Sequence, residues 1–264
     1  MSRVGLYGLI AGRLPRPLVS RIYAMPRSTR VIRAALNLVL PEQLQEAEVV
    51  AGPLRGARLL IYPRHEASFV SGLWEFWLQD ALVECLRPGD IAWDVGAYIG
   101  YFSLLMRRRS CSVLALEPDP DNRRRLERIL EMNGATDVRV LPVAALEEVG
   151  AVRLGRIWTS PSAAAIDDAG EVVAPATTLD AICAEFGPPR LVKLDVEGAE
   201  AEVLVGASRL LHEVRPLWLV ELHGEGGRQA AALLRGAGYR LRTLNRREGA
   251  THQEHILAYP PFSV

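Results

Sequence analysis

The chain has 264 residues, 49% of them hydrophobic and 23% charged, the balance of a soluble globular protein with one large domain and at most a small appendage. The formal net charge is zero, so nothing global favours nucleic acid, and no apolar run reaches the roughly 20 residues of a membrane span. The three cysteines (Cys85, Cys111 and Cys183) are scattered and lack the spacing of a zinc site, so we expect free thiols and a cytoplasmic location.

Residues 1–75 are predicted to form a helical and hairpin extension before the main domain. Residues 1–41 carry seven arginines and no acid, which leaves a net charge of −7 (0 − 7) on the rest of the chain. Prolines break the short apolar stretches there, and Gly52-Pro53-Leu54-Arg55-Gly56 between two strand patterns predicts a hairpin. We expect the basic stretch to pack on the core or to form a homodimer contact, with docking to an anionic partner as the alternative.

Residues 76–264 are predicted to form a Rossmann-like α/β domain. A helical pattern over residues 74–86 leads into alternating strand and helix patterns, which imply right-handed βαβ units and a mostly parallel sheet with helices on both faces. The last two strand patterns have no helix between them, so we expect them to pair antiparallel. The predicted strands are residues 91–95, 112–117, 138–141, 191–195, 217–222, 240–244 and 255–259. The predicted helices are residues 99–109, 120–132, 199–211 and 228–236.

A weakly patterned insertion, residues 143–190, separates the two halves of this alternation. It is rich in glycine, serine and alanine, with one strand pattern at residues 151–156 and one helix pattern at residues 178–186. Long insertions of this kind are disordered or face the substrate. The position just before the strand that carries Lys193 favours a substrate-facing lid.

The segment Asp94-Val95-Gly96-Ala97-Tyr98-Ile99-Gly100 joins a strand to a helix and predicts a nucleotide site, because glycines admit a ligand and a helix N-terminus offers free amides. Its spacing lacks the three glycines that hold a pyrophosphate, and Glu117 ends the next strand, where an acid can take both ribose hydroxyls. S-adenosyl-L-methionine, with S-adenosyl-L-homocysteine as product, fits a ligand with a ribose and no diphosphate, although a plain structural turn is the alternative. The predicted cofactor-binding residues are Asp94, Gly96, Ala97, Tyr98, Gly100, Glu117, Pro118, Asp119 and Asp195, and Asp119 is also expected to cap the following helix.

A second polar segment surrounds the only lysine of the chain, Lys193. Alternate residues of a strand share a face, so Lys193, Asp195 and Glu197 line one side of the sheet edge, and the next strand adds Glu221 and His223. Buried charges are costly unless they are paired. Either a satisfied internal ion pair or a catalytic site therefore explains this convergence.

As a catalytic site, this cluster would accept a proton from a substrate hydroxyl while a methyl group leaves a sulfonium. His223 is favoured as the base by its intrinsic pKa, with Asp195 second, and Lys193 would orient the substrate or keep the carboxylates charged. A metal bound by Asp195, Glu221 and His223 is a weaker alternative without a second histidine, and we predict none.

These segments resemble the FkbM family of methyltransferases in order and spacing over roughly residues 72–260. The segments that carry the resemblance are residues 94–103, Leu116-Glu117-Pro118-Asp119-Pro120, Thr178-Leu179-Asp180, Val192-Lys193-Leu194-Asp195-Val196-Glu197-Gly198-Ala199-Glu200 and Glu221-Leu222-His223. The resemblance implies a class I fold of seven strands, S-adenosyl-L-methionine as donor, and O-methylation of a sugar or secondary metabolite, as in natural product biosynthesis. It also places Asp195 and Glu197 beside the transferred methyl.

The resemblance includes one departure and one further residue. Tyr98 stands where the family commonly has asparagine, so we expect an altered polar contact near the methionine end of the cofactor. Glu75 matches a Gly-x-x-Glu element before the core that is expected to close over the site. With Glu221, Trp74 and Trp158, it completes the predicted residues for a small-molecule acceptor.

The remaining charged residues are predicted to have structural or solvent-exposed positions and no catalytic role. His255 is expected to pack in the last strand, and Arg125 ends an arginine run that is expected to face solvent. Three rival functions stay open. They are N-methylation of a small molecule, a nicotinamide-dependent reductase, which the missing third glycine opposes, and a non-catalytic cofactor-binding protein.

Overall fold

The computed structural model describes residues 3–16, 18, 40–156, 164–167, 169–247 and 253–260. Trp158 and most of the arginine-rich stretch, including residues 19–39, lie outside the described residues. Cys85, Cys111 and Cys183 are free thiols, as predicted. Among the helices of the described ranges, none has the length and apolar character that crossing a bilayer requires.

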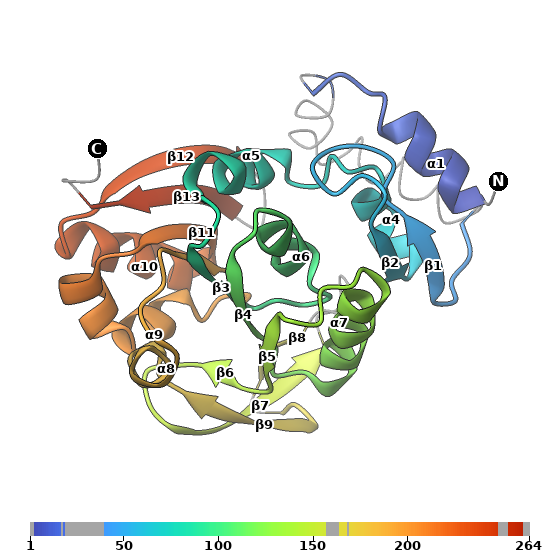
Figure 1. Ribbon diagram of the computed structural model, residues 1–264. Coiled ribbons are helices and arrows are strands. Elements are labelled where there is room, and N and C mark those ends of the chain that lie inside the picture. The colour runs from blue at the N-terminus through green and yellow to red at the C-terminus, as the bar shows by residue number, and fades with distance from the viewer. Residues whose placement is uncertain are drawn as a thin grey trace.

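A seven-stranded sheet forms the centre of the fold (Figure 1). Its order is β12-β13-β11-β10-β3-β4-β5, and β13 alone runs in the direction opposite to the other six strands. The strands are β3 (Ile91–Val95), β4 (Ser112–Leu116), β5 (Arg139–Leu141), β10 (Leu191–Leu194), β11 (Leu217–His223), β12 (Arg240–Arg247) and β13 (Gln253–Tyr259). All seven predicted strands are confirmed, and so is the antiparallel pairing of the last two.

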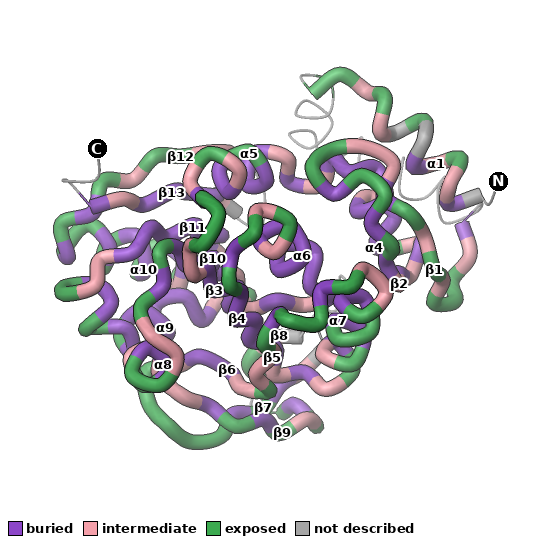
Figure 2. Tube along the Cα trace, in the orientation of Figure 1, coloured by how far each residue is buried: buried purple, intermediate pink, exposed green. Residues whose placement is uncertain are grey.

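Helices cover both faces of this sheet, and each face has its own apolar core. The first core contains residues of α5 (Phe76–Cys85), α6 (Tyr101–Arg108) and α7 (Pro120–Met132). The second contains residues of α8 (Leu179–Phe186), α9 (Glu200–Val205) and α10 (Gly224–Gly236). The central strands between the two cores are buried, as the purple tube of Figure 2 shows.

Strand alternation sends the polar residues of the sheet toward the first core. In β10, Leu191 belongs to the first core, whereas Val192 and Leu194 belong to the second. Lys193 therefore points to the face that α5 and α6 cover. By the same alternation, Asp94 of β3 points to that face.

Helix boundaries follow local capping and close packing. Asp119 accepts hydrogen bonds from the backbone of Asp121 and Asn122 at 2.9 Å each, so the predicted cap of α7 is confirmed. The predicted continuous helix over residues 199–211 is wrong, because α9 ends at Val205 and a π-helical turn follows at Leu210–Val214. A Cβ atom on Gly206 would lie 2.0 Å from the carbonyl oxygen of Leu146, so the glycine at the break lets the insertion approach.

The N-terminal extension contains the predicted hairpin and one helix that the sequence pattern did not predict. The hairpin pairs β1 (Gln45–Glu48) with β2 (Arg58–Ile61), and α1 (Arg3–Ala11) precedes it. The additional helix, α4 (Pro63–Val70), begins with proline at its first turn, and Glu66 accepts a 2.7 Å hydrogen bond from the backbone of Tyr62. The buried residues of β2 and α4 belong to the same core as those of α5 and α6, so the extension packs continuously with the main domain.

The insertion forms a second, smaller sheet with the order β6-β9-β7-β8. Its strands are β6 (Ala144–Ala145), β7 (Gly150–Arg156), β8 (Ala164–Ile166) and β9 (Val172–Thr177). The strand expected at residues 151–156 and the helix α8 are confirmed. The other strands are short and rich in alanine, which hides the alternation by which a strand is recognised. The substrate-facing role of this insertion stays a prediction.

Candidate active site

The ends of β3 and β10 meet at the centre of the candidate site. The two strands are parallel neighbours, and the Asp195 amide donates a 3.0 Å hydrogen bond to the carbonyl of Val95. Gly96 has a φ of +78°, and a Cβ atom on it would lie 1.8 Å from the carbonyl oxygen of Asp195. Glycine is therefore required where the predicted cofactor loop touches the predicted catalytic strand.

Lys193 joins the carboxylates of both strands into what we call the lysine cluster (Asp94, Lys193 and Asp195). Its Nζ lies 3.4 Å from Asp94 Oδ1, 3.2 Å from Asp195 Oδ2 and 3.4 Å from the carbonyl oxygen of Gly96. Ser103 Oγ donates a 2.6 Å hydrogen bond to the other oxygen of Asp94. Burial opposes the charge of Lys193, but Asp195 and Asp94 outweigh it and raise its pKa, so the lysine is a cation beside both carboxylates.

Glu117 lies at the end of β4 with its carboxylate held by two backbone amides. Tyr98 donates to Oε2 at 2.7 Å and Asp119 donates to Oε1 at 2.9 Å. Burial, opposed by these hydrogen bonds, raises the pKa of Glu117 to about 8. An ionised carboxylate has about four acceptor positions, and the Asn122 side chain also donates to Glu117, so one position remains for a ribose hydroxyl.

His223 lies at the end of β11 among three glutamates. Its Nδ1 is 2.8 Å from Glu200 Oε1, and its Nε2 is 3.4 Å from Glu221 Oε1 and 3.6 Å from Glu197 Oε2. Burial opposes the charge of His223, but the hydrogen bonds to Glu200 and Glu221 outweigh it and raise its pKa to about 11. At neutral pH the imidazole therefore carries a proton at both nitrogens.

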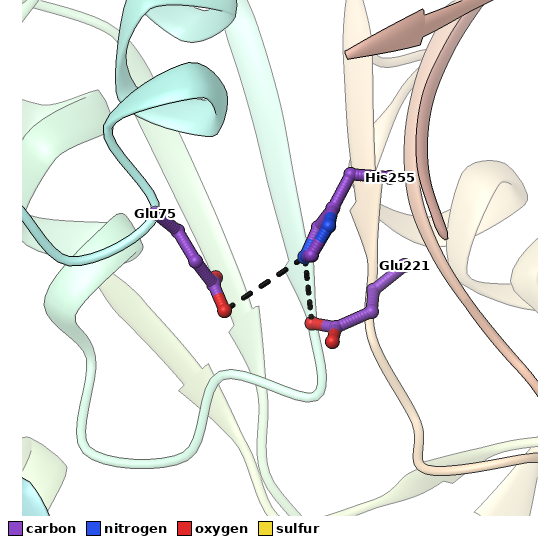
Figure 3. Close-up of side chains that lie close together, drawn as sticks. All are labelled: Glu75, Glu221 and His255. Atoms are coloured by element: carbon purple, nitrogen blue, oxygen red, sulfur yellow. Dashed lines mark ion pairs between the residues drawn. The ribbon is translucent and has the colours of Figure 1, made fainter. Parts of the chain in front are cut away.

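Glu221 connects His223 to a second, fully buried histidine. His255 of β13 stands directly opposite Glu221 in the sheet register, and its Nε2 lies 3.3 Å from Glu221 Oε2 and 3.7 Å from Glu75 Oε1 (Figure 3). Burial opposes the charge of His255, but Glu221 and Glu75 raise its pKa to about 10. Burial alone would raise the pKa of Glu221, and the two histidines instead hold it well below its ordinary value. We call this series, Glu200, His223, Glu221, His255 and Glu75, the histidine chain.

Asp195 lies between the lysine cluster and the histidine chain. Its side chain is 24% exposed, and it is the member of the lysine cluster that a substrate can reach. Burial, reinforced by the carboxylates of Glu221 and Glu197 and opposed by Lys193 and His223, raises its pKa to about 7. A carboxylate with this pKa can take up a proton near neutral pH.

Comparison with known proteins assigns the chain to a protein family. The model described as the methyltransferase FkbM domain matches residues 94–241, more than half of the 264 residues. The chain belongs to this family. Hexuronic acid methyltransferase AglP of Haloferax volcanii is 31% identical over 150 residues, which are 54% of this chain and 59% of that protein. The chain therefore spans less than two thirds of this curated relative.

Two solved methyltransferase structures are more distantly similar to this FkbM-family chain, each with a TM-score of 0.47. Precorrin-6Y C5,15-methyltransferase of Geobacter metallireducens is 15% identical, over 69% of this chain and 87% of the other. Methyltransferase FkbM of Methylobacillus flagellatus is 18% identical, over 74% of this chain and 53% of the other. The family match and the mostly parallel seven-stranded sheet with its antiparallel strand confirm the predicted class I methyltransferase fold.

The surroundings of His223 in the FkbM-family site argue against its predicted role as the base. The sequence favoured it as the base over Asp195, but a histidine with a pKa of about 11 is already protonated at neutral pH. Its intrinsic pKa was a poor guide, because three glutamates stabilise the charged form. Asp195, with a pKa of about 7, can accept a proton at that pH.

Three further residues of the FkbM-family site were missed or misplaced by sequence patterns. Glu200 orients His223 and also accepts a 2.9 Å hydrogen bond from the amide of Gly198, and the Glu-Gly-x-Glu spacing was its signal. His255 was expected to pack, and it is fully buried, but it also pairs with two glutamates. The expectation that Arg125 faces solvent is wrong, because it is 7% exposed and pairs with Glu66 at 2.6 Å.

The other predicted residues have the following places. Pro118 is half-buried beside Glu117, and Ala97 and Gly100 lie in the loop after β3, where Gly100 has a φ of +78° and begins α6. Trp74 packs against Phe69 with ring centroids 5.1 Å apart, so its role toward an acceptor stays a prediction. Trp158 lies outside the described residues.

Two sets of described residues could each offer three ligand atoms to a metal ion. They are Glu75, Glu221 and His255, and Asp195, Glu197 and His223. In each set the carboxylates raise the pKa of the histidine, so its positive charge offsets part of their negative charge, as a metal ion would do. The absence of a metal therefore stays a prediction, as does the acceptor role of Glu75.

Proposed function

We propose that the protein transfers a methyl group from S-adenosyl-L-methionine to a hydroxyl of a sugar or secondary metabolite. One observation carries this proposal: Gly96 brings the loop beside Glu117 into contact with Asp195, so a nucleoside site and a proton acceptor share one sheet edge. The relative that acts on hexuronic acid supports a sugar-like acceptor. A class I fold places its ligands at this carboxyl edge of the strands.

The residues at the edge fit the proposed donor. The Glu117 carboxylate retains acceptor capacity for a ribose hydroxyl, and the loop lacks the third glycine that a pyrophosphate needs. With both histidines charged, the lysine cluster, the histidine chain and Glu197 have a formal charge of −3, from six carboxylates (−6) and three cations (+3). This surplus favours a positively charged sulfonium at the site.

Asp195 and His223 would have different roles toward the acceptor, one as base and one in positioning. When bound, the donor supplies an electrophilic methyl, and the acceptor oxygen forms a bond to that carbon as the sulfur–carbon bond breaks. Asp195 accepts the hydroxyl proton during this transfer, because its pKa of about 7 suits a base at neutral pH. His223 keeps its proton and its hydrogen bonds to Glu200 and Glu221, so it fixes the shape of the site around the acceptor, and Lys193 holds Asp195 in place.

Incubation with donor carrying a ¹³C-labelled methyl group and a panel of neutral sugars, hexuronic acids and amino sugars tests this proposal. We expect a labelled methyl on oxygen and release of S-adenosyl-L-homocysteine, both reduced in Asp195→Asn. A label on nitrogen would favour the alternative of N-methylation, which the surplus of carboxylates near the acceptor also permits. Donor binding without turnover on any acceptor would favour a non-catalytic binding protein.

A further inference from the structure

A buried group of three residues ties the N-terminal extension to the cofactor loop. Glu66 lies on α4, outside the family match at residues 94–241, and is 2% exposed. Its Oε1 accepts hydrogen bonds from the Tyr98 hydroxyl and from Arg125 Nη1, the latter at 3.2 Å. Its Oε2 accepts a 2.6 Å hydrogen bond from Arg125 Nη2. We call Glu66, Tyr98 and Arg125 the tyrosine clamp.

Arg125 closes this clamp from α7. Besides its two bonds to Glu66, it donates a 2.8 Å hydrogen bond to the carbonyl of Leu60 in β2. Its guanidinium carbon lies 4.9 Å from the ring centroid of Tyr62 and 5.8 Å from that of Tyr98. A fork-like pair of this type fixes geometry as well as charge, and aromatic faces add a cation–π attraction. The clamp therefore balances one negative and one positive charge inside the core.

Tyr98 connects the clamp to the donor site through its own backbone. It has a φ of +53°, in the left-handed region that non-glycine residues rarely adopt. In this conformation its amide donates to Glu117, while its side chain reaches Glu66 on the opposite side. Strained backbone of this kind persists only where surrounding contacts hold it, and the clamp supplies those contacts.

We propose that Glu66 and Arg125 are positioning residues for the methyl donor, which hold Tyr98 so that the loop and Glu117 match the nucleoside before it arrives. This inference rests on the proposed function, because it takes the ligand of Glu117 to be S-adenosyl-L-methionine. The extension is then part of the donor site, although it contributes no atom to the ligand. Preorganisation of this kind improves affinity by lowering the ordering cost of binding.

Titration calorimetry with S-adenosyl-L-homocysteine tests this inference in the full-length protein and three variants. Tyr98→Phe removes one hydroxyl, and Glu66→Gln keeps the shape of the side chain but removes its charge. Asn133→Ala is the matched control, because Asn133 also ties β2 to α7, through hydrogen bonds of 2.9 and 2.7 Å with the backbone of Arg58, but is not part of the clamp. Thermal unfolding of the unliganded proteins reports any general loss of stability.

The clamp variants are expected to raise the Kd about tenfold, a typical coupling between linked sites. In turnover, KM for the donor should rise by a similar factor, while kcat at saturating donor stays within about twofold. Asn133→Ala should lower the unfolding temperature and leave the Kd unchanged.

An unchanged Kd in Tyr98→Phe, or an equal rise in Asn133→Ala, would overturn the inference. Should Glu66→Gln fail to fold, Tyr98→Phe decides alone, because it leaves the pair between Glu66 and Arg125 in place. No binding by the wild-type protein would overturn the proposed function and this inference with it.

Discussion

The lysine cluster and the histidine chain face the same core, but they differ in how far apart their members lie in the sequence. The lysine cluster joins the neighbouring strands β3 and β10, with Asp94 beside Lys193 in register. The histidine chain spans α9, β11, β13 and the turn before α5, so it includes Glu75 and His255 from outside the family match at residues 94–241. The first cluster keeps a carboxylate ready for chemistry, and the second keeps two histidines protonated.

Asp195→Asn tests which of the two groups accepts the proton. We expect kcat to fall roughly 10²- to 10⁴-fold, the usual contribution of a general base. His223→Gln should cost less, about tenfold, because it removes a hydrogen-bond donor and no base. Methyl-transfer rates at saturating substrates measure both. A larger loss in His223→Gln than in Asp195→Asn would contradict the division of roles.

Lys193→Met removes the single cation of the lysine cluster and leaves Asp94, which is fully buried, without its charge partner. Breaking a buried pair from one side costs about 3–5 kcal/mol of unfolding free energy. Urea unfolding monitored by tryptophan fluorescence checks this value. Arg107→Ala, which breaks an exposed pair with Asp137, is the control and should change little.

His255→Gln tests the histidine chain through pH. A pKa of about 10 in the folded protein, above the ordinary 6.5, gives stability that is fully present below pH 6.5 and lost as pH rises through 10. Over pH 8.5–10 the variant should lose less stability per pH unit than the wild type, by up to about 1.4 kcal/mol. Parallel urea midpoints for the two proteins across that range would show that His255 is not charged.

Glu117→Gln tests the raised pKa of Glu117 through pH. Burial raises that pKa from 4.5 to about 8, so the wild type loses stability as pH rises from 4.5 to 8, by up to about 1.4 kcal/mol per pH unit. The variant carries no charge at this position at any pH and should lack this slope in urea unfolding. Binding of S-adenosyl-L-homocysteine should nevertheless weaken, which separates the two effects.

The lysine cluster was predictable because it depends on strand alternation and on the order of parallel strands. Lys193, Asp195 and Glu221 follow from a period of two, and Gly96 and Glu117 follow from strand–turn–helix spacing. The seven strands were predictable for the same reason. A periodic pattern does not predict the charge state of His223, because that depends on three glutamates that lie close to it only in the folded protein.

The tyrosine clamp and His255 were not predictable for a different reason. Glu66 lies in a short helix of eight residues whose apolar pattern is too brief to recognise, and Arg125 sits in a run of three arginines whose other members are not buried. His255 becomes a partner of Glu221 only through the antiparallel register of β13. Contacts that depend on register or on packing between elements, and not on a repeating pattern along one strand or helix, leave no local signal.

The place of β13 has a consequence for synthesis and folding. It follows every other strand of the seven-stranded sheet along the chain, yet it is inserted between β11 and β12. Until residues 253–259 have emerged from the ribosome, β11 presents an open edge, and such edges recruit other strands. A nascent chain that stalls before this point lacks His255, so Glu75 and Glu221 would face each other without the cation between them. Pairing of β13 with β11 therefore both covers that edge and completes the charge network.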